Sequence, residues 1–217
     1  MVNKLIDHTL LKAFAKEEDI VKLCNEAKEY HFKSVCVNPV NVSLASELLK
    51  GSDVLVCTVI GFPLGANTIS VKEFETIDAI NNGANEIDMV INVGKAKEHD
   101  FDYIEKEIET IVKAAKGNTV KVIIETCYLD DYEKAEVCKA ATKAKANFVK
   151  TSTGFGTGGA NIHDVAIMKA NIASNMEVKA SGGIKTYTDV VDLVNAGATR
   201  IGASSGVAII EEERKNK

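Results

Sequence analysis

The sequence predicts a single-domain α/β protein in which residues 1–217 form one (β/α)8 barrel, the TIM-barrel architecture. Eight short runs rich in β-branched residues alternate with amphipathic helical segments, and this alternation is typical of parallel α/β folds. A length of 217 residues suits one barrel, because barrels of roughly 200–250 residues commonly form one unit. Two helices end in similar segments, Asn82-Gly83-Ala84 and Asn195-Ala196-Gly197, as repeated βα units would. An open doubly wound sheet is the competing architecture.

Each predicted strand is a short apolar run between turn-forming residues. The predicted strands are Lys4–Asp7, Lys33–Asn38, Asp53–Gly61, Glu86–Asn92, Val120–Thr126, Asn147–Ser152, Glu177–Ser181 and Thr199–Ala203. The barrel depends on the first of these, because without it seven strands remain. The predicted helices carry apolar residues on one face, as Ile104, Ile108 and Ile111 do in one of them. These helices are Glu17–His31, Val42–Lys50, Ser70–Asn82, Phe101–Ala115, Asp130–Lys145, Ile162–Ala173 and Thr188–Asn195.

Composition excludes several classes of function. A formal charge of −5 and a pI near 5.5 disfavour nucleic-acid binding, since proteins with that role usually have a basic excess. No apolar run reaches the roughly 18 residues of a membrane span, and we expect no signal peptide and no membrane partner. Five scattered cysteines without CxxC spacing indicate reduced thiols in a cytoplasmic protein. The four histidines show no metal-ligand spacing, so we expect no metal and no other cofactor.

Two lysines stand in otherwise apolar strands that lead into glycine-rich loops. Lys150 precedes Thr151 and the loop that begins at Gly154, and Lys179 precedes Gly182-Gly183. Lysine is costly to bury. Where burial is tolerated, the amine can lose its proton and become a nucleophile toward carbonyl compounds. A second positive charge nearby disfavours protonation of the first, which gives Lys179 a task beside Lys150.

Two carboxylates are predicted to share the barrel interior with these lysines. Period-two alternation points Asp88 inward while Ile87 and Met89 face the helices, and the same argument points Glu125 inward from its strand. Two ammonium groups and two carboxylates can compensate each other. Structural salt bridges are the alternative to a catalytic role, and two lysines at two glycine loops favour catalysis.

The glycine loops after the last three strands predict an anion site. The segment Gly154–Gly159 matches the dinucleotide pattern GxGxxG. Its late position, the lysine in the preceding strand and the lack of a good acidic candidate at a strand end about 20 positions later argue against a dinucleotide. Backbone N–H groups and hydroxyls would instead hold one phosphate monoester, with a helix N-terminus after Ser205. The residues concerned are Gly154, Gly182, Gly183, Gly202, Ser204 and Ser205.

Other candidates have structural alternatives of equal weight. Asp7 and Thr9 follow the first predicted strand and could contact substrate or cap a helix. Cys36 lies within a strand, where a small core residue is the usual interpretation and a reactive thiol is the other. The segment Glu211–Lys217 is expected to be a frayed, solvated helix end.

Several motifs taken together resemble the deoxyribose-phosphate aldolase family. They run in order from residue 5 to about residue 208 and therefore cover nearly the whole chain. The motifs are Leu5-Ile6-Asp7-His8-Thr9-Leu10-Leu11, Val59-Ile60-Gly61-Phe62-Pro63-Leu64-Gly65, Glu86-Ile87-Asp88-Met89-Val90, Phe148-Val149-Lys150-Thr151-Ser152-Thr153-Gly154-Phe155, Val178-Lys179-Ala180-Ser181-Gly182-Gly183-Ile184 and Arg200-Ile201-Gly202-Ala203-Ser204-Ser205.

The resemblance implies a class I aldolase that reversibly splits 2-deoxy-D-ribose 5-phosphate into D-glyceraldehyde 3-phosphate and acetaldehyde. Lys150 would form the Schiff base, Lys179 would keep its amine uncharged, and Asp88 would relay protons. The glycines and serines named above would hold the phosphate, with Asp7, Thr9, Cys36 and Thr151 as further substrate contacts. A homodimer is also implied. Some members carry a tyrosine in a C-terminal tail, and this tail has none. Another Schiff-base sugar-phosphate aldolase and a non-catalytic sugar-phosphate-binding barrel are the alternatives.

Overall fold

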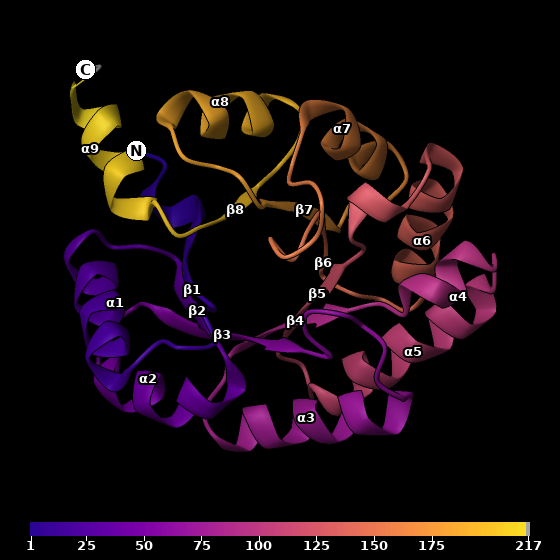
Figure 1. Cartoon of the computed structure of the whole chain (residues 1–217), viewed down its shortest axis with the longest axis horizontal. Coiled ribbons are helices and arrows are strands. Elements are labelled where there is room, and N and C mark those ends of the chain that lie inside the picture. The colour runs from indigo at the N-terminus through magenta and orange to yellow at the C-terminus, as the bar shows by residue number, and fades with distance from the viewer. Residues whose placement is uncertain (216–217) are drawn as a thin grey trace.

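A closed barrel of eight parallel strands in sequential order forms the centre of the molecule (Figure 1). The computed structural model describes residues 1–215. The strands are β1 (Ile6–Leu10), β2 (Ser34–Val37), β3 (Leu55–Ile60), β4 (Glu86–Val90), β5 (Thr119–Ile123), β6 (Phe148–Lys150), β7 (Glu177–Ser181) and β8 (Arg200–Ala203). The barrel closes because β1 pairs with β8, Ile6 opposite Ile201 and Asp7 opposite Gly202. The predicted barrel is confirmed, and the open doubly wound alternative is wrong.

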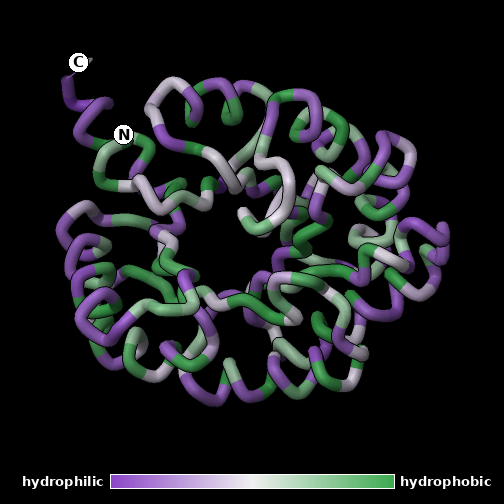
Figure 2. The backbone as a smooth tube through the Cα atoms, in the orientation of Figure 1, coloured by the Kyte–Doolittle hydropathy of each residue, from purple (hydrophilic) through white to green (hydrophobic). Residues whose placement is uncertain are grey.

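Helices surround the strands on the outside of the barrel (Figure 1). Figure 2 shows hydrophobic stretches in the strands and hydrophilic residues along the outer margins of the helices. The helices are α1 (Glu17–Glu29), α2 (Val42–Leu48), α3 (Ile69–Asn81), α4 (Val93–Lys97), α5 (Phe101–Ala114), α6 (Asp131–Lys143), α7 (Ile162–Ala170), α8 (Tyr187–Asn195) and α9 (Gly206–Lys215). None of the helices in the described chain is long and apolar enough to cross a membrane.

The alternation within the strands separates an apolar layer from a charged interior. Ile87 and Met89 on β4 are fully buried in the apolar cluster shared by strands and helices. Side chains of this size contribute about 1.5–3 kcal/mol each when buried. Glu86 and Asp88, at the intervening positions, pair with cations of other strands and therefore lie inside the barrel.

The first strand lies later in the sequence than predicted. Residues Asn3–Leu5 form a 3₁₀ turn, and β1 runs from Ile6 to Leu10. The strand includes Asp7 and His8, which are both buried. Polar residues in a strand hide the apolar pattern by which strands are recognised, and here the ladders to β2 and β8 determine the conformation.

The sequence had suggested that Glu125 points into the barrel. In the structure it lies beyond the end of its strand and outside the barrel interior. The strand β5 ends at Ile123, and Glu125 has a φ of 53°, in the left-handed region that interrupts a strand. Its carboxylate accepts a hydrogen bond from the Thr153 backbone N–H at 3.1 Å and another from the Thr153 hydroxyl. It therefore fixes the loop after β6 and takes no part in the interior ion pairs.

Helix α9, up to Lys215, is less solvated than the predicted frayed helix end. Helix α9 continues to Lys215, and residues 216–217 lie outside the described part of the chain. Glu213 is buried and accepts a hydrogen bond from the Val2 backbone N–H at 3.1 Å, beside the amino group of Met1 at 3.5 Å. The charged residues near the end of α9 therefore do not all face solvent.

Candidate active site

Asp88 is the centre of a buried ion-pair network inside the barrel. Its Oδ2 accepts hydrogen bonds from Lys150 Nζ at 2.8 Å and from Lys179 Nζ at 2.7 Å. Its Oδ1 accepts one from Lys121 Nζ at 2.8 Å. The alternation of β4, β5, β6 and β7 delivers these four side chains to one point, since each strand turns every second residue inward. The two lysines and the aspartate singled out in the sequence are thus brought together.

The network continues beyond Asp88 through Asp7 and through three residues that the sequence interpretation left out, Lys121, Glu86 and Arg200. Lys121 Nζ lies 2.7 Å from Glu86. Arg200 on β8 binds Glu86 at 2.8 Å and Asp7 at 2.9 Å through one nitrogen. Asp7 in turn lies 2.5 Å from Lys179 Nζ. Buried charges are tolerated when each is paired in this way.

The electrostatic shifts follow from this pairing. Burial opposes ionisation of Asp88, but Lys121, Lys150 and Lys179 outweigh it and hold the pKa of Asp88 well below its ordinary value. Burial likewise opposes the charged form of Lys179, but Asp7 and Asp88 hold the pKa of Lys179 above its usual range. Lys179 is therefore an ammonium group paired with two carboxylates, those of Asp7 and Asp88.

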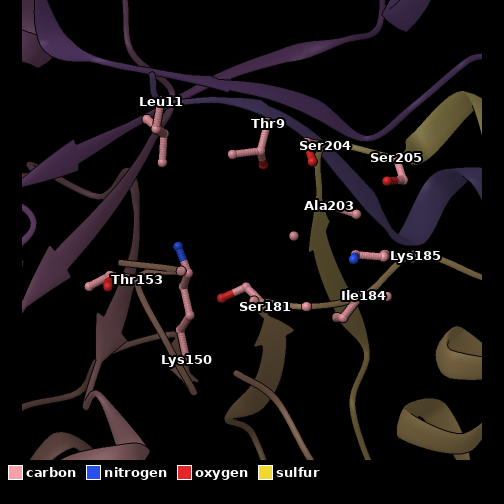
Figure 3. A pocket seen from close by; sticks show the side chains of 14 residues that line it. Thr9, Leu11, Lys150, Thr153, Ser181, Ile184, Lys185, Ala203, Ser204 and Ser205 are labelled. Atoms are coloured by element: carbon pink, nitrogen blue, oxygen red, sulfur yellow. The ribbon is translucent and has the colours of Figure 1, made fainter. Parts of the chain in front are cut away.

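A cavity of about 210 Å³ opens above the network at the carboxyl ends of the strands (Figure 3). This is the face at which TIM barrels carry their active sites. Lys150 points its nitrogen into the cavity, next to Ser181 (Figure 3). The predicted residues that line the cavity are Thr9, Lys150, Gly154, Gly182, Gly183, Gly202, Ser204 and Ser205.

The far side of this cavity has the composition of an anion site. Ser204 and Ser205 lie across from Lys150 in Figure 3, and helix α9 begins at the next residue, Gly206. Free N–H groups at a helix N-terminus favour an anion. Gly182 and Gly183 have φ values of 91° and 79°, which side-chain-bearing residues rarely adopt. The positive charge of Lys185, absent from the sequence prediction, lines the same side.

Position 202 requires a glycine for a steric reason. A Cβ at this position would lie 2.9 Å from Ser181 Cβ and 3.1 Å from Lys179 Cε. Contacts this short would displace one of the two side chains. The glycine therefore leaves the space that the stem of Lys179 occupies on its way to Asp88.

Four predicted residues lie outside the lining of the cavity, besides Lys179. Asp7 and Asp88 are fully buried in the network beneath it. The Thr151 hydroxyl donates to the Ser181 carbonyl at 3.1 Å and so joins β6 to β7. Cys36 is fully buried, and a hydrogen bond with Cys57 lowers the pKa of its thiol.

The sequence contained signals for the missed network residues. Lys121 is a charged residue within the apolar run Thr119–Ile123, as Lys150 is in its own strand. The alternation that points Asp88 inward also points Glu86 inward. For Arg200, at the first position of its strand, no local pattern distinguishes an interior from a surface residue.

Two groups of side chains among the described residues have the donor atoms of a metal site. Potential ligand atoms lie within 4.8 Å of one another in Cys36, Cys57 and Asp88, and likewise in Asp7, Cys57 and Glu86. Lys121 and Lys179 already bind the Asp88 carboxylate. Ammonium groups at this distance oppose the binding of a further cation.

Comparison with known proteins identifies the family of the chain. The family model for DeoC/LacD family aldolases matches residues 1–212. A deoxyribose-phosphate aldolase from Streptococcus sanguinis is 58% identical over 98% of this chain and 96% of its own length. One from Lysinibacillus sphaericus is 60% identical over 95% of this chain and 93% of its own.

A solved structure shares both the fold and the sequence pattern. The deoxyribose phosphate aldolase from Aeropyrum pernix, described as a unique tetrameric structure, superposes with a TM-score of 0.93 at 36% identity. The match covers 100% of this chain and 92% of the other. The resemblance inferred from the motifs is confirmed, and aldolases are lyases. The chain belongs to the DeoC/LacD family of aldolases.

Proposed function

We propose that this enzyme reversibly cleaves 2-deoxy-D-ribose 5-phosphate to D-glyceraldehyde 3-phosphate and acetaldehyde, with Lys150 forming a Schiff base. The names of the relatives support the substrate. The cavity supports it independently, because an amine lies on one side and an anion site on the other. A phosphate held at Ser204 and Ser205 would position the aldehyde carbon over Lys150.

One observation carries the proposal: Lys150 is the interior cation of the described network that reaches the cavity. The network joins three carboxylates, Asp7, Glu86 and Asp88, to four cations, Lys121, Lys150, Lys179 and Arg200. Three carboxylates balance three of these cations. Because excess buried charge is costly, the interior is neutral when the amine of Lys150 is uncharged, and that is the nucleophilic form.

The chemistry then needs only the groups of the chain. Lys150 Nζ adds to C1 of the open-chain sugar, and loss of water gives an iminium. The C3 hydroxyl gives up its proton, its oxygen becomes the new carbonyl, and the electrons of the C2–C3 bond move toward the iminium nitrogen. Glyceraldehyde 3-phosphate leaves. The enamine is protonated at C2, and water releases acetaldehyde and the free amine.

Asp88 is the proposed proton relay in these steps, acting through water. Its low pKa makes it a weak base on its own. Lys179 and Lys121 stay bound to it when Lys150 turns to the substrate, so the carboxylate remains paired throughout. Preorganised charge of this kind stabilises a transition state without rearrangement.

The proposal is tested by trapping. Borohydride added with the sugar phosphate should reduce the iminium and add mass at Lys150. The variant Lys150→Leu should show no adduct and no release of glyceraldehyde 3-phosphate in a coupled assay. Lys50→Leu, at an exposed lysine, should behave as the natural protein does. An adduct at another lysine, or none with the natural protein, would contradict the assignment.

We also propose that the protein is a homodimer. Helix α3 buries Lys72 and Thr76 but exposes Val71, Phe74 and Ile77, the reverse of the usual pattern. An apolar outward face suits contact with a second copy. The tetrameric description of the relative from Aeropyrum pernix is compatible with self-association.

A further inference from the structure

A second cavity lies beyond Thr153 and has no part in the proposed reaction. Its volume is about 170 Å³, and its walls come from loops after four different strands, with Leu64, Val93, Tyr128 and Phe155 as its apolar lining. Thr153 lines both this cavity and the one that holds Lys150. The side chain of Thr153 is therefore part of the wall between the two spaces.

This wall is held firmly in place. Glu125 accepts hydrogen bonds from both the backbone N–H and the hydroxyl of Thr153, and Phe155 N–H donates to the Thr153 hydroxyl at 3.0 Å. The Phe155 ring meets Phe62 edge to face, with 5.3 Å between centroids. A Cβ on Gly156 would lie 2.9 Å from the sulfur of Cys127, so the loop fits closely against the 3₁₀ turn Thr126–Tyr128 that follows β5.

The position of this wall determines which part of a substrate bound to Lys150 would face Thr153. Thr153 and the group formed by Ser204, Ser205 and Lys185 lie on opposite sides of Lys150 (Figure 3). In an iminium the carbonyl carbon is planar, with nitrogen, C2 and one further substituent about 120° apart. A substrate whose phosphate lies at Ser204 directs C2 to that side. The third substituent of C1, a hydrogen in an aldehyde, then faces Thr153.

We propose that Thr153, held by Glu125, is a specificity-determining residue that favours aldehyde donors over ketone donors. This inference rests on the proposed Schiff-base function of Lys150. A ketone has carbon in place of that hydrogen, and the wall leaves little space for it. The second cavity is the space into which such a substituent would extend if the wall were made smaller.

The test measures donor preference in the synthetic direction, with glyceraldehyde 3-phosphate as acceptor. The readout is the ratio of kcat/KM for acetone to kcat/KM for acetaldehyde. Thr153→Ser removes the methyl group and keeps the hydroxyl that binds Glu125. We expect the ratio to rise about tenfold, since one methyl group in a confined pocket changes selectivity by about that factor. Thr153→Val keeps the branched shape and the backbone N–H that donates to Glu125, so its ratio should stay within about twofold of the natural ratio.

A second readout follows the iminium directly. Borohydride trapping with acetone should label Lys150 faster in Thr153→Ser than in the natural protein, whereas trapping with acetaldehyde should change little. Phe14→Ala, at an exposed phenylalanine that lines neither cavity, is the control for a general effect at the barrel mouth.

The two proposals can fail separately. If the natural protein forms no adduct and releases no glyceraldehyde 3-phosphate, the proposed function fails. If it does both but Thr153→Ser leaves the donor ratio unchanged, the assignment of Thr153 alone is overturned. An equal rise of the ratio in Thr153→Val would also overturn it, because the size of the side chain would then not be the cause.

Discussion

At the scale of single residues, Asp88 has two oxygens with different partners. Lys121 holds Oδ1, and Lys150 and Lys179 share Oδ2. Lys121 and Lys179 would therefore keep the carboxylate in one orientation while Lys150 reacts as proposed. An interaction that stays in place during a reaction costs no rearrangement in the transition state.

A prediction at this scale concerns Lys185. Removing its charge in Lys185→Ala should raise KM for the sugar phosphate about tenfold, equivalent to about 1.4 kcal/mol, with a smaller effect on kcat. The reason is that the phosphate is a remote group whose binding positions the substrate. Steady-state kinetics checks this, with Lys12→Ala as control at an exposed lysine that lies outside the cavity lining. Equal KM values for the two variants would contradict the role.

Sequence reasoning found the residues of the proposed reaction more readily than their partners. Lys150, Lys179 and Asp88 are conspicuous because each interrupts an apolar strand. Glu125 satisfies the same pattern and was misplaced, since its left-handed φ ends the strand before it. Alternation predicts a side only while the backbone stays extended, and nothing local in the sequence gives that end point.

At the scale of elements, a buried ion pair joins helix α3 to the barrel. Lys72 Nζ donates to the Gly65 carbonyl at 2.7 Å, to the Val90 carbonyl at 2.8 Å and to Glu107 on α5 at 2.6 Å. Both charged side chains are fully buried. The pair thus ties the loop after β3 to the end of β4. That loop carries Phe62, which packs against Phe155.

Lys72→Met should destabilise the protein by about 3–5 kcal/mol, because it leaves the Glu107 carboxylate buried without a cation. The double variant Lys72→Met with Glu107→Leu should recover a large part of that loss. Urea unfolding measures both values. A double variant no more stable than the single one would show that the carbonyl contacts of Lys72 are the larger contribution.

The boundaries of a helix or strand were predictable from the sequence where a local pattern marks both of its ends. Strand β7 runs over Glu177–Ser181 in both the prediction and the structure. Helix α4 was not predicted, because its five residues, Val93–Lys97, are too few to show a helical period. The extent of α9 depends on Glu213 meeting the first residues of the chain, a contact between distant segments that no local pattern contains.

At the scale of the whole molecule, the buried carboxylates of Asp7 and Asp88 make the stability of the fold depend on pH. The lysines around Asp88 hold its pKa well below 3.8, although burial opposes this. A carboxyl group whose pKa is lower in the folded state than in the unfolded chain stabilises the folded state at any pH above the unfolded-state pKa. This stabilisation is lost as the pH falls from the unfolded-state pKa through the folded-state pKa.

The free energy of unfolding should therefore fall steeply as pH drops from about 4 to about 2, by up to about 1.4 kcal/mol per pH unit for each such carboxylate. Asp88→Asn removes one of these carboxylates and should reduce the slope of unfolding free energy against pH by the contribution of that one group. Urea unfolding across the pH range measures it. Asp102→Asn, at an exposed aspartate, should leave the slope unchanged. The same slope in both variants would contradict the assignment.

The apolar face of α3 gives a prediction about assembly. Phe74 is 71% exposed, and Phe74→Glu should convert a dimer to a monomer, since a buried unpaired charge opposes association. Light scattering coupled to gel filtration measures the mass. Phe14→Glu, at a phenylalanine that is 77% exposed, is the matched control. A mass unaffected by Phe74→Glu would place any contact elsewhere.

The interior ion pairs also have a consequence for protein engineering. If Lys150 reacts as proposed, a designer who transplants it alone into another barrel would obtain a protonated, unreactive side chain or an unstable host. Six other charged residues, from β1, β4, β5, β7 and β8, are matched to one another around its amine. The unit that can be moved to a new scaffold is the whole set of seven, together with the glycine that makes room for Lys179.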